Sequence, residues 1–150
     1  MVRARYKIDA SPLFRAMKRA IRNEVSEPFF RIGTFQFTWW EALRMREGGR
    51  TRKVPMIHVT YQGKYIGRIE ADRYLAGSGF DTKEARREVA EQIKLIVTHP
   101  RKAAAAEATV TLKASGSPRC ACCGRPLAGV EDRRSGVGMM CSRKWGWARG

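Results

Sequence analysis

Apolar side chains recur with helical spacing in the first thirty residues of the chain. They follow Ser11 and Pro12, a pair that favours the start of a helix because serine caps free N–H groups and proline fits the first turn. Pro28 then ends the pattern. We therefore predict a helix that begins at Ser11 and buries Leu13, Met17, Ala20, Ile21 and Val25.

Basic side chains recur on the opposite side of this predicted helix, three or four residues apart. Such a stripe is either a solvated outer face or a surface laid along a phosphate backbone. The sequence leaves both interpretations open. The residues concerned are Arg15, Lys18, Arg19 and Arg22.

Aromatic and polar residues alternate within the segment 29–40, and this alternation predicts a strand with one aromatic face. Phe35, Phe37 and Trp39 make up that face. Exposed aromatic rings between positive charges can hold the bases of single strands. A domain of this size also needs large side chains in its core. We favour the core interpretation for these three residues.

A second alternating segment, 54–69, predicts a β-hairpin that turns at Gln62 and Gly63. Its apolar residues face the same side in both strands. His58 falls between them and is therefore expected on the solvent side. No neighbouring residue in the sequence pairs with His58 as a nucleophile or an acid, so we assign it no function.

Helical spacing returns after a Gly-Ser-Gly break and continues to about Val97. The outer face of this second helix alternates in charge, which is typical of a solvated surface. A short alanine-rich helix is expected over 101–108, and glycine, serine and proline then predict a linker. The expected organisation is an α+β domain over residues 1–112, a linker over 113–119 and a cysteine-rich module over 120–150.

These elements predict the α+β fold class, with a small antiparallel sheet of three strands, two main helices and a C-terminal module like a zinc knuckle. The 150 residues suffice for one modest core. No apolar run is long enough to span a membrane, and no apolar segment follows the basic N-terminus as in a secretory signal. We therefore expect a cytoplasmic protein without a membrane partner.

The chain is strongly basic, with 30 lysines and arginines, 14 acidic residues and a net charge of +16. Residues 1–60 carry 13 basic and 5 acidic side chains, and residues 111–150 carry 8 and 2. Residues 61–110 carry 9 and 7, so two basic ends flank a nearly balanced middle. This distribution is expected of a protein that binds polyanions, above all nucleic acid.

Two further groups of basic residues are candidates for contacts with phosphate. A glycine-containing loop is expected to expose Arg44, Arg46, Arg50, Arg52 and Lys53. The C-terminal module is expected to present Arg119, Arg125, Arg133, Arg134, Arg143 and Lys144. Trp145 and Trp147 either cover the cysteines, which we favour, or stack on bases.

All four cysteines lie in the last 31 residues. Cys120 and Cys123 have the C-x-x-C spacing, which lets two thiolates of one turn reach the same cation, and Gly124 supplies the positive φ that such a turn needs. Cys141 follows a glycine-rich bend, near the expected start of a short helix. A polar segment this small gains most of its folding energy from a bound ion. We therefore predict that Cys120, Cys123 and Cys141 bind zinc.

The fourth ligand of this predicted site is left open, because a closed structural zinc site has four. Cys122 is one choice, although adjacent residues rarely bind one ion without strain. The other choices are His99, Glu131 and Asp132. A disulfide or four free thiols are the alternatives to a metal. The compressed cysteine spacing matches none of the common iron–sulfur patterns.

The C-terminal third resembles a small three-cysteine domain that is widespread in bacteriophage and actinobacterial proteins. That family reads, in outline, C-x-x-C-G-R-x-L, a spacer with a serine, and then G-I-G-P-x-C. The resemblance implies zinc binding and an origin in a phage or mobile element, but no activity, since the family has no known function. The matching residues are Cys120, Cys123, Gly124, Arg125, Leu127, Gly136, Gly138 and Cys141, and Met139 replaces the usual proline.

Motifs of catalysis are missing from the sequence. It has no glycine-rich phosphate loop, no H-E-x-x-H and no G-x-S-x-G, and His58 is not followed by the glutamate of a zinc deaminase. We therefore expect a non-enzymatic accessory protein that binds DNA or RNA. The alternative is an interaction module or inhibitor that binds an acidic surface of a host complex, such as a polymerase, a ribosome or a defence system.

Overall fold

The computed structural model describes residues 4–45, 48–77 and 83–147. Its strands are β1 (Arg5–Lys7), β2 (Phe29–Ile32), β3 (Phe35–Met45), β4 (Thr51–Tyr61), β5 (Lys64–Glu70) and β6 (Arg73–Ala76). Its helices are α1 (Ser11–Arg22), α2 (Lys83–Thr98), α3 (Pro100–Lys113), α4 (Val130–Ser135) and α5 (Met139–Lys144).

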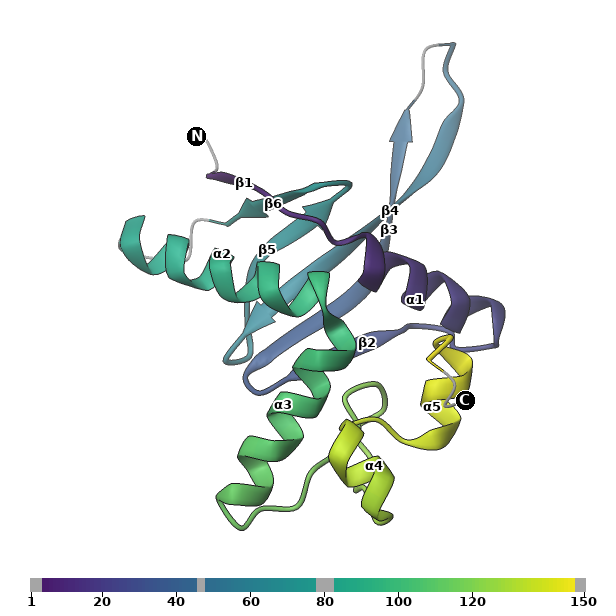
Figure 1. Cartoon of the computed structure of the whole chain (residues 1–150). Helices are drawn as coiled ribbons and strands as arrows, with labels where there is room; N and C mark the ends of the chain where they lie inside the picture. The colour runs from purple at the N-terminus through teal and green to yellow at the C-terminus, as the bar shows by residue number, and fades with distance from the viewer. Residues whose placement is uncertain (1–3, 46–47, 78–82, 148–150) are drawn as a thin grey trace.

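The described strands form one antiparallel sheet in the order β1-β6-β5-β4-β3-β2. Helices α1 and α2 lie against one face of it, while α3, α4 and α5 gather near the β2 edge (Figure 1). Strands and helices are thus segregated into layers, which confirms the predicted α+β class.

The sheet is larger than the three strands that the sequence predicted, because it has six within the described residues. The segment predicted as one strand, 29–40, folds into β2 and β3 around a turn at Gly33, whose φ is 56°. β1 and β6 are only three and four residues long. Strands this short carry too few positions for their alternation to be recognised.

Helix α1 begins where the sequence predicted, but its start is stabilised differently. The carboxylate of Asp9 accepts hydrogen bonds from the backbone N–H of Ser11 at 3.1 Å and from its hydroxyl at 2.6 Å. The Ser11 side chain makes no cap of its own. The hydroxyl bond from Ser11 is also the main reason why the pKa of Asp9 is lowered.

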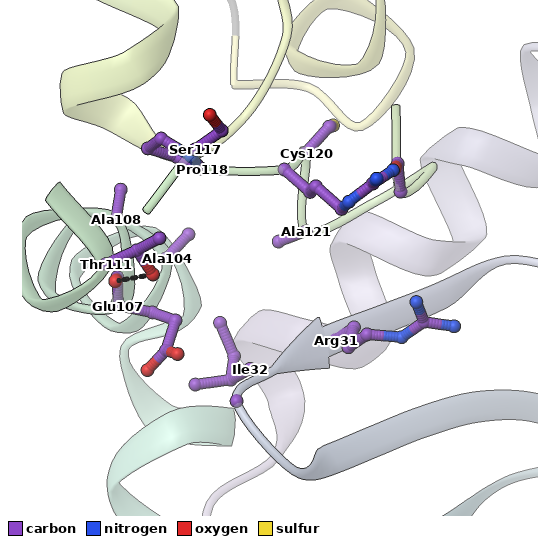
Figure 2. A pocket seen from close by; sticks show the side chains of 14 residues that line it. Arg31, Ile32, Ala104, Glu107, Ala108, Thr111, Ser117, Pro118, Cys120 and Ala121 are labelled. Atoms are coloured by element: carbon purple, nitrogen blue, oxygen red, sulfur yellow. Dashed lines mark hydrogen bonds between the residues drawn. The ribbon is translucent and has the colours of Figure 1, made fainter. Parts of the chain in front are cut away.

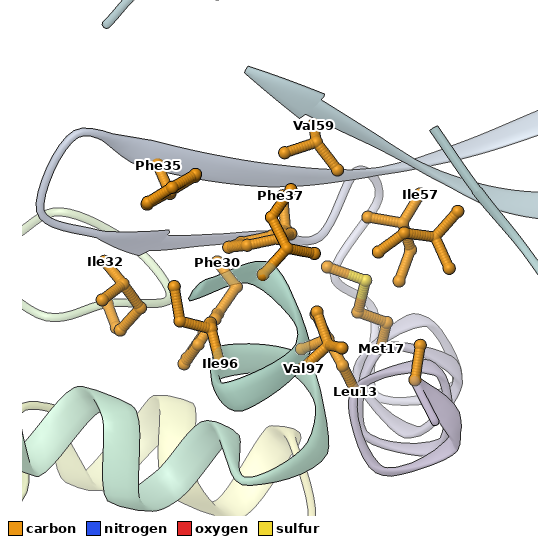
Figure 3. Packing of buried hydrophobic residues seen from close by; sticks show 14 of the residues in the cluster. Leu13, Met17, Phe30, Ile32, Phe35, Phe37, Ile57, Val59, Ile96 and Val97 are labelled. Atoms are coloured by element: carbon orange, nitrogen blue, oxygen red, sulfur yellow. The ribbon is translucent and has the colours of Figure 1, made fainter. Parts of the chain in front are cut away.

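The hydrophobic core lies between the helices and one face of the sheet (Figure 3). Phe35 and Phe37 are buried in it, and Trp39 packs against it with its ring 6.1 Å from that of Phe14. The core interpretation is therefore confirmed for Phe35 and Phe37, whose rings are not available to stack on bases, and Trp39 is partly buried against the same core.

The C-terminal segment contributes to the same core as the sheet. Trp145 is only 2% exposed, and its ring centre lies 6.0 Å from that of Phe30 in β2. Cys122, Leu127 and Val137 belong to the same cluster. Helix α3 runs to Lys113, beyond the predicted 101–108, so the irregular connection that follows is short. The division into domains over 1–112 and 120–150 stays a prediction.

None of the helices in the described part of the chain combines the length and the apolar character that crossing a membrane requires.

Candidate metal centre and basic surfaces

A tight turn places the first two cysteines of the candidate metal centre. The backbone N–H of Gly124 donates to the carbonyl of Cys120 at 2.8 Å, and the N–H of Cys120 donates to the carbonyl of Arg125 at 2.9 Å. Gly124 has the predicted positive φ, at 75°. The turn therefore brings Cys123 back beside Cys120, which is the purpose of the C-x-x-C spacing.

The third cysteine comes from the first turn of α5. Gly138 precedes this helix, and its N–H donates to the sulfur of Cys120 at 3.3 Å. An N–H group that donates to a ligand sulfur stabilises its thiolate form and orients it. This hydrogen bond joins the start of α5 to the cysteine turn and does not require a bound ion.

The sulfur atoms of Cys120, Cys123 and Cys141 all lie within 4.8 Å of one another. This spacing is compatible with a metal ion bound between them. No histidine, carboxylate or fourth cysteine of the described residues joins the group at that spacing. His99, Glu131 and Asp132 therefore lie outside it, and so does Cys122, although Cys122 is near enough to donate to Cys120.

The four cysteines are free thiols in different surroundings. Hydrogen bonds from the thiols of Cys122 and Cys141, with a smaller contribution from the N–H of Gly138, lower the pKa of Cys120. The same bond to Cys120 raises the pKa of Cys141. Burial is the main cause that raises the pKa of Cys122. Cys120 is therefore the preferred thiolate, and a cation is needed before Cys141 also ionises easily.

The spacer between the turn and α5 is fixed against α3. The N–H of Ala121 donates to the carbonyl of Gly136 at 2.9 Å. Gly136 has a φ of 75°, and a Cβ added there would lie 2.2 Å from the carbonyl oxygen of Ala104. A hollow of about 190 Å³ remains between β2, α3 and the cysteine turn. Figure 2 shows the side chains that line it.

The predicted basic stripe of α1 is exposed, and it faces the C-terminal segment. Together these two parts of the chain line a groove of about 360 Å³. The side-chain amide of Asn23, just beyond α1, donates to the carbonyl of Lys144 in α5 at 2.9 Å. The stripe contributes Arg15, Lys18, Arg19 and Arg22 to the groove, and the C-terminal segment contributes Trp145, Gly146 and Trp147.

The predicted basic loop is the end of a long hairpin, which corrects the expectation of a flexible loop there. Strands β3 and β4 extend well beyond the rest of the sheet (Figure 1). Arg44 lies in β3, Arg52 and Lys53 lie in β4, and only Arg50 lies in the described part of the loop. Arg46 lies outside the described residues. Pairing of the strands fixes the backbone at Arg44, Arg52 and Lys53.

Two of these hairpin residues have acidic partners. Arg44 lies 2.6 Å from the carboxylate of Glu70, and Lys53 lies 3.8 Å from that of Glu41. Both pairs are largely exposed, so they contribute little to stability. They reduce, but do not remove, the positive charge of the hairpin.

The basic residues of the C-terminal segment are distributed over its turn and its two short helices. Arg119 donates to the carbonyl of Gly124 at 3.0 Å and so supports the cysteine turn. Arg133 and Arg134 lie in the last turn of α4, and Arg125 is exposed. Arg143 and Lys144 end α5, where Lys144 meets the end of α1. Trp145 is buried against the sheet, so it does not stack on bases.

Sequence reasoning missed one group of exposed side chains. The ring of His58 contacts those of Trp40 and Tyr65, on the face of the sheet opposite α1 and α2. The sequence contained a signal for the exposure of Trp40, because adjacent residues in a strand point to opposite faces. With Trp39 assigned to the core, Trp40 had to project outward.

We compared the chain with protein-family models, with curated proteins and with solved structures, and none of the three comparisons found a match. The resemblance of the C-terminal third to the three-cysteine domain therefore stays a prediction. The clustering of its three cysteines is the part of that prediction that the structure supports.

Proposed function

We propose that this chain is a non-enzymatic nucleic-acid-binding accessory protein, encoded by a phage or mobile element. In this proposal Cys120, Cys123 and Cys141 bind a zinc ion, and the basic face of α1 contacts phosphate groups. The family resemblance supports the origin. The cysteine cluster and the groove beside α1 support the binding function.

The observation that carries the proposal is the composition of the groove between α1 and the C-terminal segment. Its four charged lining residues are all basic, and each is exposed. Four cations along one helix face repel each other at low salt, and a polyanion removes that repulsion. Trp147, which is half-buried, adds an aromatic edge to the same groove.

Zinc would act on this surface through α5. Cys141 lies in the first turn of that helix, and Lys144, at its end, accepts the hydrogen bond from Asn23. An ion bound to Cys141 would fix the position of α5 and hence the wall of the groove that faces α1. The metal therefore has a structural role in the proposal, and no chemical step depends on it.

Fluorescence anisotropy with labelled DNA and RNA, measured at several salt concentrations, tests the proposal. Phosphate contacts predict that affinity falls steeply with salt, by about one power of the salt concentration for each contact. Replacing Arg15, Lys18, Arg19 and Arg22 by alanine should remove most of the binding and flatten that slope. The matched control replaces Arg87 and Lys94, two exposed basic residues of α2.

Three results would overturn the proposal. These are an affinity that does not depend on salt, an α1 variant that binds as well as the wild type, and an equal loss in the α2 control. Capture of one specific protein from a nuclease-treated lysate, without measurable binding to nucleic acid, would instead favour the interaction module or inhibitor.

A further inference from the structure

The open face of the sheet carries a connected group of aromatic rings. The rings of Trp40 and His58 are stacked, with centres 4.7 Å apart and planes inclined by 16°. Tyr65 meets His58 edge-on at 5.2 Å. Trp40 is 51% exposed and Tyr65 is 49% exposed. We call these three residues the aromatic platform.

Strand pairing explains how three strands build this platform. In β3 and β4, Thr38 pairs with His58, so both side chains leave the sheet on the side opposite the core. A shift in register between Val59 and Thr60 then sets Thr60 against Tyr65 in β5. The irregularity moves Tyr65 onto the same face as His58. The platform is therefore determined by the register of the sheet.

Packing against the sheet accounts for only part of the platform. Trp40 pairs with Met56, which is 3% exposed on this same face, so Trp40 helps to cover it. Contact with Met56 explains why part of the Trp40 indole is buried. It does not explain why the other half is exposed to solvent. Clusters of large, half-exposed rings are typical of surfaces that bind a partner.

The pKa of His58 is lowered, mainly by burial and secondly by the positive charge of Arg68. The imidazole ring is therefore neutral at neutral pH. A neutral ring stacks on the indole of Trp40 and meets the phenol of Tyr65 edge-on, so it adds aromatic surface rather than charge to the platform.

Positive charge surrounds the platform on the same face. The strand registers place Lys7, Arg31, Arg44, Arg52, Arg68 and Arg73 on it. Glu70 lies among them and approaches Arg44 at 2.6 Å and Arg68 at 3.6 Å. Basic residues still outnumber this carboxylate, so the face is complementary to a polyanion.

The platform side of the sheet also continues to the cysteine turn. Arg31 lies over the ring of Phe29 at 5.5 Å, and both residues share the open face at the β2 edge. The N–H of Arg31 donates to the carbonyl of Ala121, between Cys120 and Cys122, at 2.8 Å. A ligand lying across the platform toward β2 would therefore reach the candidate metal module.

We infer that the aromatic platform binds single-stranded nucleic acid, with bases stacked on Trp40 and Tyr65 and with phosphates held by the surrounding arginines. Exposed rings on a sheet surface can stack only on unpaired bases, because the bases of a duplex are already stacked and enclosed by its backbones. This site lies on the other side of the sheet from α1. The inference rests on the proposed function only for the class of ligand.

Anisotropy with labelled dT15, U15 and a 15-base-pair duplex, each at fixed salt, tests the inference. Loss of one stacked base predicts a reduction of about 5- to 150-fold in affinity for the single strands in Trp40→Ala and in Tyr65→Ala. Duplex affinity should not change. Trp40→Phe keeps an aromatic surface and should restore most of the affinity. Leu43→Ala, an exposed apolar residue of β3 on the opposite face, is the matched control.

A direct spectroscopic measurement follows from the different exposure of the tryptophans. Of the four in the chain, Trp40 is half-exposed whereas Trp145 is buried. Stacking of a base should quench the Trp40 fluorescence, and most of this quenching should be absent in Trp40→Phe. Thermal melting of each variant, measured alongside, shows whether it is still folded at the assay temperature, so that lost affinity can be told from lost folding. Trp40→Phe keeps most of the contact with Met56 and should stay closest to the wild type.

The outcomes separate this inference from the proposed function. Single-strand affinity that survives Trp40→Ala and Tyr65→Ala but is lost in the α1 variant overturns the platform and leaves the proposed function intact. Single-strand affinity that depends on Trp40 and survives in the α1 variant supports the platform and contradicts the α1 groove. If the wild type binds neither the single strands nor the duplex, both the platform and the proposed function are wrong.

Discussion

At the scale of single residues, two adjacent cysteines have different surroundings. Cys122 is 5% exposed and belongs to the hydrophobic core, whereas Cys123 is exposed and belongs to the cluster of three sulfurs. A buried cysteine that packs as a small hydrophobe does not require its thiolate form. Position in the turn, rather than residue type alone, therefore decides which cysteines belong to the candidate metal site.

This difference predicts the metal content of two variants. Wild-type protein purified with zinc should hold about one ion per chain. Cys123→Ser should lose most of it, because two sulfurs hold zinc weakly, while Cys122→Ala should retain it. Elemental analysis of both variants provides the measurement. Equal loss of metal in Cys122→Ala would show that Cys122 is the fourth ligand and that this description of the cluster is wrong.

His58 predicts how stability depends on pH near neutrality. Its pKa in the folded chain is lowered from the ordinary 6.5, so the unfolded chain binds a proton more readily. The contribution of the neutral ring is therefore complete above the unfolded pKa, and it is lost as the pH falls through that value toward the folded pKa. Urea denaturation between pH 7.5 and 5 measures this loss, which should be smaller in His58→Gln. An equal loss in that variant would assign it to other groups.

At the scale of elements, long periodic segments could be predicted and short irregular ones could not. The start of α1 at Ser11, the aromatic strand and the hairpin turn at Gln62 follow from spacing and turn chemistry over many residues. β1 depends instead on pairing with β6, a distant part of the chain, and β6 itself has only four residues in which to show an alternation. The same limit applies to the site, because C-x-x-C spacing predicted the cysteine turn but the platform required the strand register.

Gly136, at the end of α4, allows a sharp prediction about how α4 packs against α3. It ends α4 in the left-handed conformation, and a Cβ there would meet the carbonyl of Ala104 in α3. Gly136→Ala should therefore destabilise the protein by about 1–3 kcal/mol and lower its affinity for a metal, because the spacer must move and would displace Cys141 in the following α5. Gly129→Ala is the matched control, since Gly129 has a negative φ and an added Cβ would meet no neighbour within 4 Å.

Thermal unfolding of both glycine variants, followed by circular dichroism, measures the difference. For a chain of this size, each kcal/mol corresponds to a shift of about 2–4 °C in the melting temperature. Similar melting temperatures for the two variants would mean that the contact between α4 and α3 does not constrain the spacer.

At the scale of the whole molecule, the C-terminal segment and the sheet share their most buried side chains. The ring of Phe30 lies 6.0 Å from Trp145 and 5.8 Å from Trp147, and Phe30 itself is fully buried. The backbone hydrogen bond from Arg31 to Ala121 joins the cysteine turn to β2. The cluster of three cysteines is therefore placed to affect more than its own turn, even though the sequence suggested a separate module after a linker.

Removal of the metal should consequently lower the stability of the whole chain in one step. A chelator leaves three close thiols without a cation, which frees α5 and with it Trp145. Because Trp145 packs on Phe30, the sheet should lose stability together with the tail, and far-ultraviolet circular dichroism and tryptophan fluorescence should report the same lower melting temperature. Trp145→Ala, which should cost about 3–5 kcal/mol, should reproduce this destabilisation with the metal still present. Two separate transitions, with the sheet melting at an unchanged temperature after chelation, would show instead that residues 120–150 fold as an independent module.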